Sequence, residues 1–322
     1  MSQDRQIVYP DAEPATARLL QGSLQRRLDK LGAFTCHLDA PVNDEQFSAR
    51  IDGAEAIILG HWHVSDAVLR SANGLKIIAY TGIGVASQVN LELASELGIM
   101  VCNTPGYANQ TVAEHAIALM LAAARQIPIL AADARSGGWN HGRPGFDLYG
   151  KTLGLVGLGG IGKRTAVLAQ AFGMDVIAWT AHPDAARENE TGVRFKSLEA
   201  VLESSDIVSL HLALTSETEG LITTDLLARM KQGALLINTA RGEIIDEAAL
   251  LDALQSGRIS AGLDVFHQEP LPSDHPFREL ENVIITPHVG YNTPEATLAL
   301  FEIVVSSLEA FYAGDPINVV NR

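Results

Sequence analysis

The sequence predicts an α/β protein with two folding units, each built around a parallel β-sheet. Short apolar runs alternate with helical patterns along most of the chain, as they do when helices connect parallel strands. The 322 residues are enough for two domains of ordinary size. A glycine-rich stretch without periodicity, "RSGGWNHGRPGFDLYG" (135–150), separates the two regions of regular alternation, and we interpret it as a connecting loop.

The N-terminal region contains the first series of predicted elements. Apolar runs predict strands at 54–60, 75–82 and 98–105, and helical patterns lie between them at 65–72 and 90–98.

The segment "TVAEHAIALMLAAAR" (111–125) predicts a helix that begins with a capping box of Thr111 and Glu114 and continues to Pro128. Its nearly all-apolar surface predicts burial between domains or subunits.

From residue 151 the alternation is regular, and it ends in a long amphipathic helix at 293–314. The predicted helices end near glycines, which provide left-handed C-caps. The predicted strands lie at 151–158, 174–179, 206–214, 234–240, 259–266 and 281–288. The predicted helices between them lie at 161–173, 197–205, 224–233 and 246–257.

The composition is that of a well-packed soluble protein, with 47% hydrophobic and 19% charged residues. The chain has 23 Lys and Arg against 38 Asp and Glu, which gives a formal net charge of -15. This balance argues against a nucleic-acid partner, because few cations are available to neutralise phosphates. A small anionic ligand is still compatible with it, since such a ligand needs only one or two well-placed cations.

The two cysteines, Cys36 and Cys102, have no CxxC spacing, so they indicate neither a zinc site nor a disulfide framework. We interpret them as reduced thiols of a cytoplasmic protein, and no metal site is expected. The N-terminus lacks the apolar core of a signal peptide. We find no run of about 18 apolar residues, so neither a membrane span nor a membrane partner is expected.

The stretch "GLVGLGGIGKR" follows a predicted strand and leads into a predicted helix, the context in which GxGxxG spacing predicts a dinucleotide cradle. The first glycine permits the tight turn, the second lets the backbone approach the pyrophosphate, and the third lets the helix pack close to the strand. N–H groups at the helix N-terminus would meet the phosphate charge. The residues expected at the cofactor are Gly157, Gly159, Gly160, Ile161 and Gly162.

The next strand ends near Thr180, at the place where Rossmann units that bind NAD usually carry Asp or Glu for the ribose hydroxyls. A carboxylate would repel the 2′-phosphate of NADP, and a threonine does not. The cationic candidates for that phosphate are His182 and the more distant Arg187. The choice between NAD and NADP stays open, and the missing carboxylate favours acceptance of NADP.

Five stretches together resemble the D-isomer-specific 2-hydroxyacid dehydrogenases, and they cover nearly the whole chain. They are the glycine loop, "NTPGYANQTVAEHAIALML" (103–121), "LLINTARGEIIDEAAL" (235–250), "AGLDVFHQEPLP" (261–272) and "ITPHVGYNT" (285–293). The resemblance implies two doubly wound parallel-sheet domains, with a Rossmann cofactor domain inserted into a flavodoxin-like substrate domain and the active site in the cleft. It assigns residues 1–103 and 293–322 to the substrate domain and 104–292 to the dinucleotide-binding domain.

The family's catalytic groups fall on Arg241, Glu269 and His288. Arg241 follows a strand, so its guanidinium can reach the rim of the sheet and grip a substrate carboxylate with two donors. His288 also follows an apolar strand and can transfer the proton that accompanies hydride transfer. Glu269, as a carboxylate beside an imidazole, would favour the protonated ring that reduction of a ketone needs.

The resemblance also places Thr239 and Ala240 along the cofactor and Asp264 near the nicotinamide carboxamide. The stretch "TGIGVASQVNLE" resembles the family's substrate loop, in which the N–H groups of Ile83 and Gly84 would bind a carboxylate.

Some positions depart from the family or stay open. The family usually has Pro where Ala213 stands and often has acidic residues where Ala86 and Asn90 stand, and the sequence does not show the consequence. At the end of a strand in the substrate half, three residues either shape substrate choice or form a polar strand end. These are His61, Trp62 and His63. We interpret the remaining histidines, including His37 and His115, as structural.

The reaction implied by the resemblance is reversible hydride transfer between nicotinamide and C2 of a small 2-keto or 2-hydroxy acid of D configuration, such as glyoxylate or hydroxypyruvate. The family is usually homodimeric through the cofactor domain, which the apolar helix at 111–125 fits. The chain ends at Arg322, so no long C-terminal regulatory domain is expected.

Two alternatives remain. The intact Arg, Glu and His argue against a formate-type dehydrogenase, which needs no acid–base histidine in the same role. The acidic chain argues against a nucleotide-sensing co-repressor scaffold.

Overall fold

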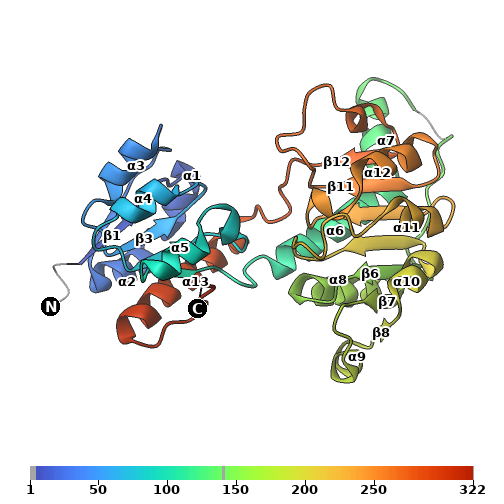
Figure 1. The fold of residues 1–322 in the computed structure, drawn as a ribbon. Coiled ribbons are helices and arrows are strands. Elements are labelled where there is room, and N and C mark those ends of the chain that lie inside the picture. The colour runs from blue at the N-terminus through green and yellow to red at the C-terminus, as the bar shows by residue number, and fades with distance from the viewer. Residues whose placement is uncertain (1–4, 140–141, 322) are drawn as a thin grey trace. The chain divides into compact units, whose positions relative to one another are not determined.

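The structure of the protein, a computed structural model, describes residues 5–139 and 142–321. They form two compact units, Met1–Ala108 together with Thr293–Arg322, and Asn109–Asn292. We call the first the split unit and the second the inserted unit, because both ends of the chain belong to the first (Figure 1). Each unit contains one sheet whose paired strands are all parallel, so the predicted fold class is confirmed.

The split unit has five strands in the order β2-β1-β3-β4-β5, which is the flavodoxin-like doubly wound order. The strands are β1 (Gln6–Tyr9), β2 (Ala33–Cys36), β3 (Ala56–Leu59), β4 (Ile77–Tyr80) and β5 (Met100–Cys102). The helices are α1 (Pro14–Ala17), η1 (Arg18–Leu20), α2 (Ser23–Leu31), α3 (Asp44–Ile51), α4 (Asp66–Ser71), η2 (Val85–Ser87), α5 (Leu91–Glu96) and α13 (Pro294–Ala313). Every residue of β3 and β4 is buried, which explains their continuous apolar runs.

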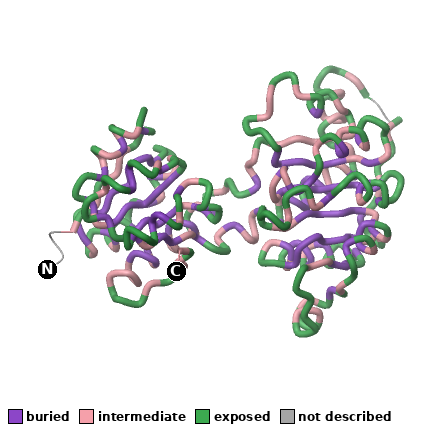
Figure 2. Tube along the Cα trace, viewed as in Figure 1, coloured by how far each residue is buried: buried purple, intermediate pink, exposed green. Residues whose placement is uncertain are grey.

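Two apolar cores hold this sheet. One core joins it to α3, α4 and α5 through Phe47, Val68 and Leu93. The other joins it to α2 and α13 through Leu28 and Phe301. Buried residues are accordingly concentrated in the strands and on the inner sides of the helices (Figure 2).

The inserted unit has seven strands in the order β12-β11-β10-β9-β6-β7-β8. From β8 to β11 this is the Rossmann order, and β12 extends the sheet at the far edge. The strands are β6 (Thr152–Val156), β7 (Asp175–Trp179), β8 (Arg194–Phe195), β9 (Ile207–Leu210), β10 (Leu235–Asn238), β11 (Ser260–Leu263) and β12 (Val283–Ile285). The helices are α6 (Asn109–Ala124), α7 (Ile127–Arg135), α8 (Gly160–Ala171), α9 (Ala185–Thr191), α10 (Leu198–Ser204), α11 (Thr224–Arg229), η3 (Gly242–Ile244), α12 (Glu247–Gln255) and η4 (Pro276–Glu279).

The start of α6 differs from the prediction. The helix begins at Asn109, so Thr111 lies inside it and is not its N-cap. Glu114, the expected capping partner, instead accepts a hydrogen bond from the Gln110 side chain at 2.5 Å. The predicted capping box is therefore wrong, because the helix already includes the two residues before it.

The apolar surface of α6 packs within its own unit. The helix contacts α8 and the strands β10, β11 and β12, and it buries Ala116, Leu119 and Met120. Packing against the sheet and a neighbouring helix accounts for the burial that was expected between domains or subunits.

The end of α6 also differs from the prediction. The helix ends at Ala124, and Gln126 then adopts a left-handed conformation. Pro128, expected to stop the helix, lies in the first turn of α7, where a missing N–H breaks no helical hydrogen bond. Of the predicted loop at 135–150, residues 140 and 141 lie outside the described residues, and the rest after Arg135 contains neither helix nor strand.

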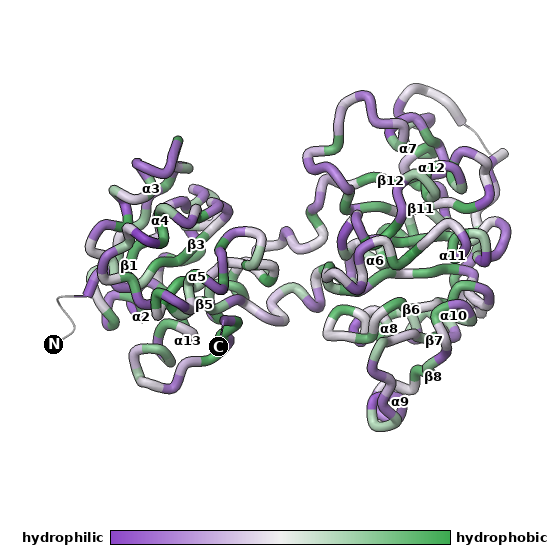
Figure 3. Tube along the Cα trace, in the orientation of Figure 1, coloured by the Kyte–Doolittle hydropathy of each residue, from purple (hydrophilic) through white to green (hydrophobic). Residues whose placement is uncertain are grey.

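No membrane-spanning segment is expected from the sequence, but α13 meets the length and hydropathy criteria for one. α13 is long and apolar enough to cross a membrane, and α6 and α7, bent by 62° at their break, meet that criterion as a pair. α13 packs against α2 and β4, buries Phe301, Val304 and Leu308, and receives a hydrogen bond from Arg27 of α2 on Glu309. This packing is typical of a core helix in a soluble protein, and the strands beneath it are similarly hydrophobic (Figure 3).

Phe301→Ala should lower the free energy of unfolding by about 3–5 kcal/mol, because it removes a large side chain from a closed core. Phe301 is 1% exposed. Leu298→Ala on the same helix is the control, since Leu298 is 45% exposed and its truncation should change stability by less than about 1 kcal/mol. Urea unfolding of both variants measures the difference, and equal losses would contradict the core role of α13.

Candidate active site

The glycine loop connects β6 to α8 at the carboxyl end of the inserted unit's sheet. Gly157 has a φ of 102°, which glycine adopts readily, and its N–H donates to the carbonyl oxygen of Trp179 at 2.9 Å. A Cβ atom on Gly162 would lie 2.4 Å from the carbonyl oxygen of Gly157, whereas one on Gly159 would meet nothing within 4 Å. Gly162 is therefore needed for close packing, and the space beside Gly159 is open.

The first turn of α8 lies against the start of α6. A Cβ atom on Gly160 would lie 2.3 Å from the side-chain nitrogen of Asn109. Arg164 Nε donates to Gln110 Oε1 at 2.7 Å, and Ile161 is partly exposed. α6 thus fixes the position of this helix end.

Thr180 follows β7 directly and is partly exposed. Its Oγ1 accepts a hydrogen bond from the N–H of His182 at 3.4 Å. Arg187 donates to the carbonyl oxygen of His182, and its Cζ lies 5.7 Å from the ring centre of Phe195. The two cationic side chains singled out in the sequence are therefore on the segment that follows Thr180.

The end of β10 forms a turn held by a buried amide. Asn238 is 1% exposed, its Oδ1 accepts from the N–H of Ala240 at 3.0 Å, and its Nδ2 donates to the carbonyl oxygen of Arg241 at 2.8 Å. The Arg241 side chain is partly exposed, and its Nη1 donates to the carbonyl oxygen of Ala240 at 2.6 Å. Thr239 Oγ1 is buried and has no hydrogen-bond partner among the described residues.

A close backbone contact brings this turn to the end of the neighbouring strand β11. A Cβ atom on Gly242 would lie 2.2 Å from the carbonyl carbon of Phe266. The N–H of Phe266 in turn donates to Glu269 Oε1 at 3.0 Å. The Arg241 and Glu269 segments are therefore neighbours at one edge of the sheet.

Glu269 also contacts His288, which follows the next strand, β12. Glu269 Oε2 lies 2.6 Å from His288 Nδ1, and both side chains are about one-third exposed. The ring of His288 meets Tyr291 edge-on at a centroid distance of 6.1 Å. Nε2 of His288 has no hydrogen-bond partner within the described part of the chain.

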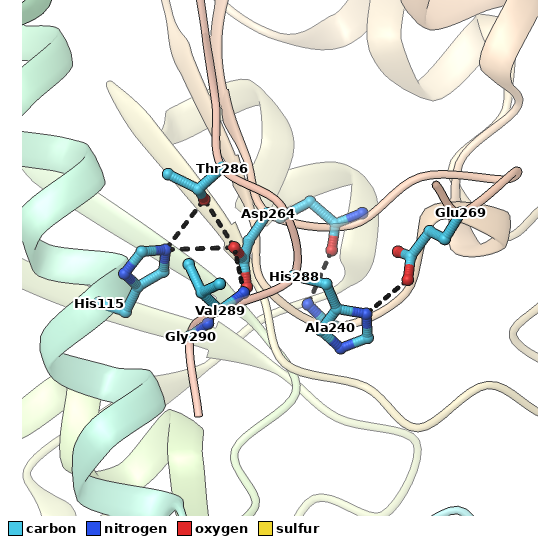
Figure 4. A network of polar contacts seen from close by, with 9 residues as sticks. His115, Ala240, Asp264, Glu269, Thr286, His288, Val289 and Gly290 are labelled. Carbon is cyan, nitrogen blue, oxygen red and sulfur yellow. Dashed lines mark hydrogen bonds and ion pairs between the residues drawn. The ribbon is translucent and has the colours of Figure 1, made fainter. Parts of the chain in front are cut away.

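The backbone turn that carries His288 is left-handed, with a φ of 53°, and is bonded to Asp264 (Figure 4). The N–H of His288 donates to the carbonyl oxygen of Asp264 at 2.8 Å. The N–H of Val289 donates to Asp264 Oδ1 at 2.9 Å, and that of Gly290 to Oδ2 at 2.8 Å. Thr286 Oγ1 donates to Oδ1 at 2.6 Å. Asp264 thus fixes the whole segment 286–290.

Asp264 is 1% exposed and nevertheless ionised. Burial acts to raise its pKa, but hydrogen bonds from His115, Thr286, Val289 and Gly290 outweigh burial and hold the pKa below its usual value. Because the folded value is the lower one, this carboxylate stabilises the fold above the unfolded pKa, and the contribution is lost as the pH falls through the folded pKa.

Two histidines to which the sequence analysis gave no functional role lie in this region. His115 of α6 places Nε2 3.1 Å from Thr286 Oγ1 and 3.4 Å from Asp264 Oδ1. His211 follows β9 beside the glycine loop, where its Nε2 lies 2.9 Å from Ser209 Oγ and burial lowers its pKa to about 4. His211 lies two residues before Ala213, one of the positions compared with the family above, whereas the contact of His115 joins residues too far apart in sequence for any motif to indicate.

The expected substrate loop lies in the split unit, at the carboxyl end of β4. The carbonyl oxygen of Gly82 accepts hydrogen bonds from the N–H and Oγ1 of Thr104, at 2.9 and 3.0 Å. Asn103 Nδ2 donates to the carbonyl oxygen of Ile83 at 3.0 Å, and Ile83 is 48% exposed. Gly84 precedes η2. The loop is therefore fixed from the end of β5.

The stretch His61–Trp62–His63 is tied down by Asp11, whose carboxylate accepts the N–H of Gly60 at 2.9 Å and that of Trp62 at 2.8 Å. Trp62 stacks on the fully buried Phe47 at a centroid distance of 5.9 Å, so this partly buried side chain packs against the core. His61 is exposed, and His63 Nδ1 lies 3.1 Å from the carbonyl oxygen of Ser87.

One departure from the family pattern has a structural role. Asn90 Oδ1 accepts from the N–H of Leu93 at 3.1 Å and caps α5, while its Nδ2 donates to Asp66 at 3.1 Å. An acidic residue would provide the cap but would repel Asp66. Nothing in the structure explains Ala86.

Known proteins resemble this chain over most of its length. The NAD binding domain of the D-isomer specific 2-hydroxyacid dehydrogenases matches residues 117–290. A glyoxylate reductase of Korarchaeum cryptofilum is 39% identical over 292 residues, 88% of each chain. A D-3-phosphoglycerate dehydrogenase of Archaeoglobus fulgidus is 38% identical over 86% of this chain, which spans 53% of that relative. The structure of an acyclic imino acid reductase in complex with NADPH and D-Arg is 30% identical, with a TM-score of 0.86 over 98% of this chain and 99% of that one.

These matches extend well beyond the glycine loop and include both units. The chain is therefore an oxidoreductase of the D-isomer specific 2-hydroxyacid dehydrogenase family, and its inserted unit contains that family's NAD binding domain.

Proposed function

We propose that the protein is an NAD(P)-dependent dehydrogenase that interconverts a small 2-keto acid and the corresponding D-2-hydroxy acid. The observation that carries the proposal is the 2.6 Å contact between Glu269 and His288, on the strand ends next to the one that bears Arg241. A carboxylate–imidazole pair beside a guanidinium supplies both an acid–base group and a partner for the substrate carboxylate.

His288 is the proposed proton donor in reduction and the proton acceptor in oxidation. Glu269 receives the N–H of Phe266 on Oε1 and therefore directs Oε2 at Nδ1 of the imidazole. This contact fixes the orientation of the ring. Nε2 is then the atom that exchanges a proton with the substrate oxygen.

Arg241 is the proposed carboxylate clamp. A guanidinium has five N–H donors in a fixed plane, and that of Arg241 forms only one hydrogen bond with the described residues, from Nη1 to the carbonyl oxygen of Ala240. The remaining donors can bind both oxygens of a carboxylate and orient C2. The N–H groups of Ile83 and Gly84, on an exposed loop of the split unit, are proposed as further donors to the substrate.

The residues of the inserted unit fit a nicotinamide dinucleotide, which supplies or accepts the hydride when bound. The open space beside Gly159 suits a pyrophosphate, and the buried, unpartnered Oγ1 of Thr239 suits a polar group of the cofactor. Thr180 is the proposed ribose contact, where the absence of a carboxylate favours acceptance of NADP. The other proposed cofactor residues are Gly157, Gly160, Ile161, Gly162, Ala240 and Asp264.

A small 2-keto acid such as glyoxylate or hydroxypyruvate is the proposed substrate, supported by the similarity to a glyoxylate reductase. The formate-type alternative would leave the Glu269–His288 pair without its acid–base role. The co-repressor alternative is disfavoured by the formal charge of -15.

We also propose a cytoplasmic homodimer assembled through the inserted unit. The expected interface helix, α6, packs on its own sheet, so the support lies in the segment after it. α7 has no buried residue, and Ile127, Trp139 and Tyr149 are 51%, 83% and 81% exposed. Large exposed apolar side chains along one stretch of chain are typical of an interface.

His288→Ala should lower the rate of keto-acid reduction by about 10²–10⁴-fold, the usual contribution of a general acid. The measurement is the rate of NADH and NADPH oxidation with glyoxylate, hydroxypyruvate or pyruvate as the substrate. A separate assay of formate oxidation tests the alternative of a formate-type dehydrogenase. His37→Ala in the split unit is the control and should keep wild-type rates. A His288→Ala enzyme with more than half of the wild-type turnover, with chemistry limiting, would remove His288 from the proposed role.

Gly159→Ala should weaken NADH or NADPH binding by at least about tenfold, because the added methyl group would occupy the space proposed for the pyrophosphate. Its thermal unfolding should stay at the wild-type temperature. The matched variant Gly162→Ala should lower the temperature of thermal unfolding, since its methyl group would meet the carbonyl oxygen of Gly157 at 2.4 Å. Fluorescence titration and thermal unfolding separate the two effects, and tight cofactor binding by Gly159→Ala would argue against the cradle.

Thr180→Asp should reduce the efficiency with NADPH and spare or improve that with NADH. The new carboxylate would repel a 2′-phosphate that carries roughly -1.5 to -2 charges. The ratio of kcat/KM for the two cofactors at one salt concentration is the measurement, and each tenfold change corresponds to about 1.4 kcal/mol of differential binding. An unchanged ratio would mean that Thr180 does not face the ribose.

A further inference from the structure

His115 contacts the segment 286–290 at two places. Its Nε2 lies 3.1 Å from Thr286 Oγ1 and 3.4 Å from Asp264 Oδ1, and the side chain is 20% exposed. The ring also lies against Gly290, where an added Cβ atom would come within 3.3 Å of His115 Cδ2. Figure 4 shows the imidazole reaching from α6 toward Thr286 and Asp264.

The direction of the hydrogen bond follows from counting protons. The hydroxyl of Thr286 has one proton and donates it to Asp264 Oδ1 at 2.6 Å. Nε2 of His115 must therefore be the donor to Thr286 Oγ1, so this nitrogen carries a proton. The same N–H points to the Asp264 carboxylate as a second, longer contact.

The support beneath His115 is rigid. α6 packs on β10, β11 and β12, and Ala113 and Ala116, within the same helical turn as His115, are fully buried. The turn it contacts has a strained element, since His288 adopts a φ of 53° without being glycine. A fixed donor on a packed helix is suited to hold such a turn in one conformation.

We propose that His115 is a positioning residue that holds His288 in register with Glu269, acting through Thr286 and Asp264. The inference rests on the proposed acid–base role of His288. Asp264 connects His115 to the turn that carries His288. It contacts His115 and Thr286, and its carboxylate also accepts the N–H groups of Val289 and Gly290, the two residues that follow His288. Loss of the His115 donor leaves the oxygens of Asp264 and Thr286 less constrained, and the imidazole of His288 loses its fixed position.

The test compares His115→Phe with His115→Gln. Phenylalanine keeps a ring against Gly290 and removes the donor, whereas the glutamine amide nitrogen can reach the position of Nε2. His115→Phe should lower kcat for keto-acid reduction by about tenfold, since a displacement of the reacting group on the ångström scale has effects of this size or larger. KM and cofactor affinity should stay within about twofold of wild type, and His115→Gln should recover most of the loss.

Thr286→Val removes the other partner of the contact between His115 and Thr286, and it keeps the proposal testable if His115→Phe folds poorly. It should lower kcat at least as much, because it also removes the hydrogen bond from Thr286 to Asp264 Oδ1. The double variant should lose less than the product of the two single losses, because both substitutions remove the contact between His115 and Thr286. Thr297→Val is the control, since it removes a threonine hydroxyl that donates to the backbone at 3.0 Å on α13, and it should leave kcat unchanged. Losses in the two single variants that multiply in the double variant would overturn the proposal.

Hydrogen exchange gives a readout that does not depend on catalysis. The amides of His288, Val289 and Gly290 are all bonded to Asp264, so His115→Phe should speed their exchange by about tenfold and His115→Gln should restore it. Unchanged exchange, or faster exchange with wild-type kcat, would overturn the role of His115. If the wild-type protein binds no nicotinamide cofactor and reduces no 2-keto acid, the proposed function fails, and exchange still decides whether His115 holds the turn.

Discussion

The buried carboxylate of Asp264 is the constraint on which the polar edge of the inserted unit depends. It stands at the end of β11, keeps its charge because several donors converge on it, and bonds the turn that follows β12. Without that turn, His288 would have no reason to adopt a left-handed backbone or to face Glu269. At the end of the neighbouring strand β10, the buried amide of Asn238 holds the turn that carries Arg241 in a similar way. The backbone that carries His288 and the backbone that carries Arg241 are thus each held by a buried polar side chain.

The sequence predicted those parts of the fold that depend on local pattern. From residue 151 onward, apolar runs and helical periodicity follow each other so regularly that most of the Rossmann strands and helices could be predicted, since each run is buried as a unit. The glycine spacing predicted the turn after β6, where Gly162 meets the carbonyl oxygen of Gly157. The short strand β8 and the polar helix α9 were missed because neither has enough apolar residues to form a pattern.

The sequence could not predict features that depend on partners distant along the chain. The start of α6 was misplaced, because the helix begins before Thr111 and Glu114 bonds the side chain of Gln110 within it. The capping-box pattern does not distinguish this arrangement from a true N-cap. His115 was interpreted as merely structural, since its contact with Thr286 joins two residues that only the folded sheet brings together. Arg241, Glu269 and His288 were named by resemblance, but the hydrogen bonds that orient them were not deducible from any motif.

The insertion of one unit into the other has a consequence for biosynthesis. The inserted unit is continuous in sequence and can complete its sheet while the chain is still emerging from the ribosome. The split unit cannot, because Phe301, Val304 and Leu308 of its core belong to the final helix. Its early strands, including the wholly buried β3 and β4, must wait with one face only partly covered, by α2 and η1, until α13 has been made. During that interval the part of the split unit that precedes the inserted unit is the most exposed to aggregation and to capture by chaperones.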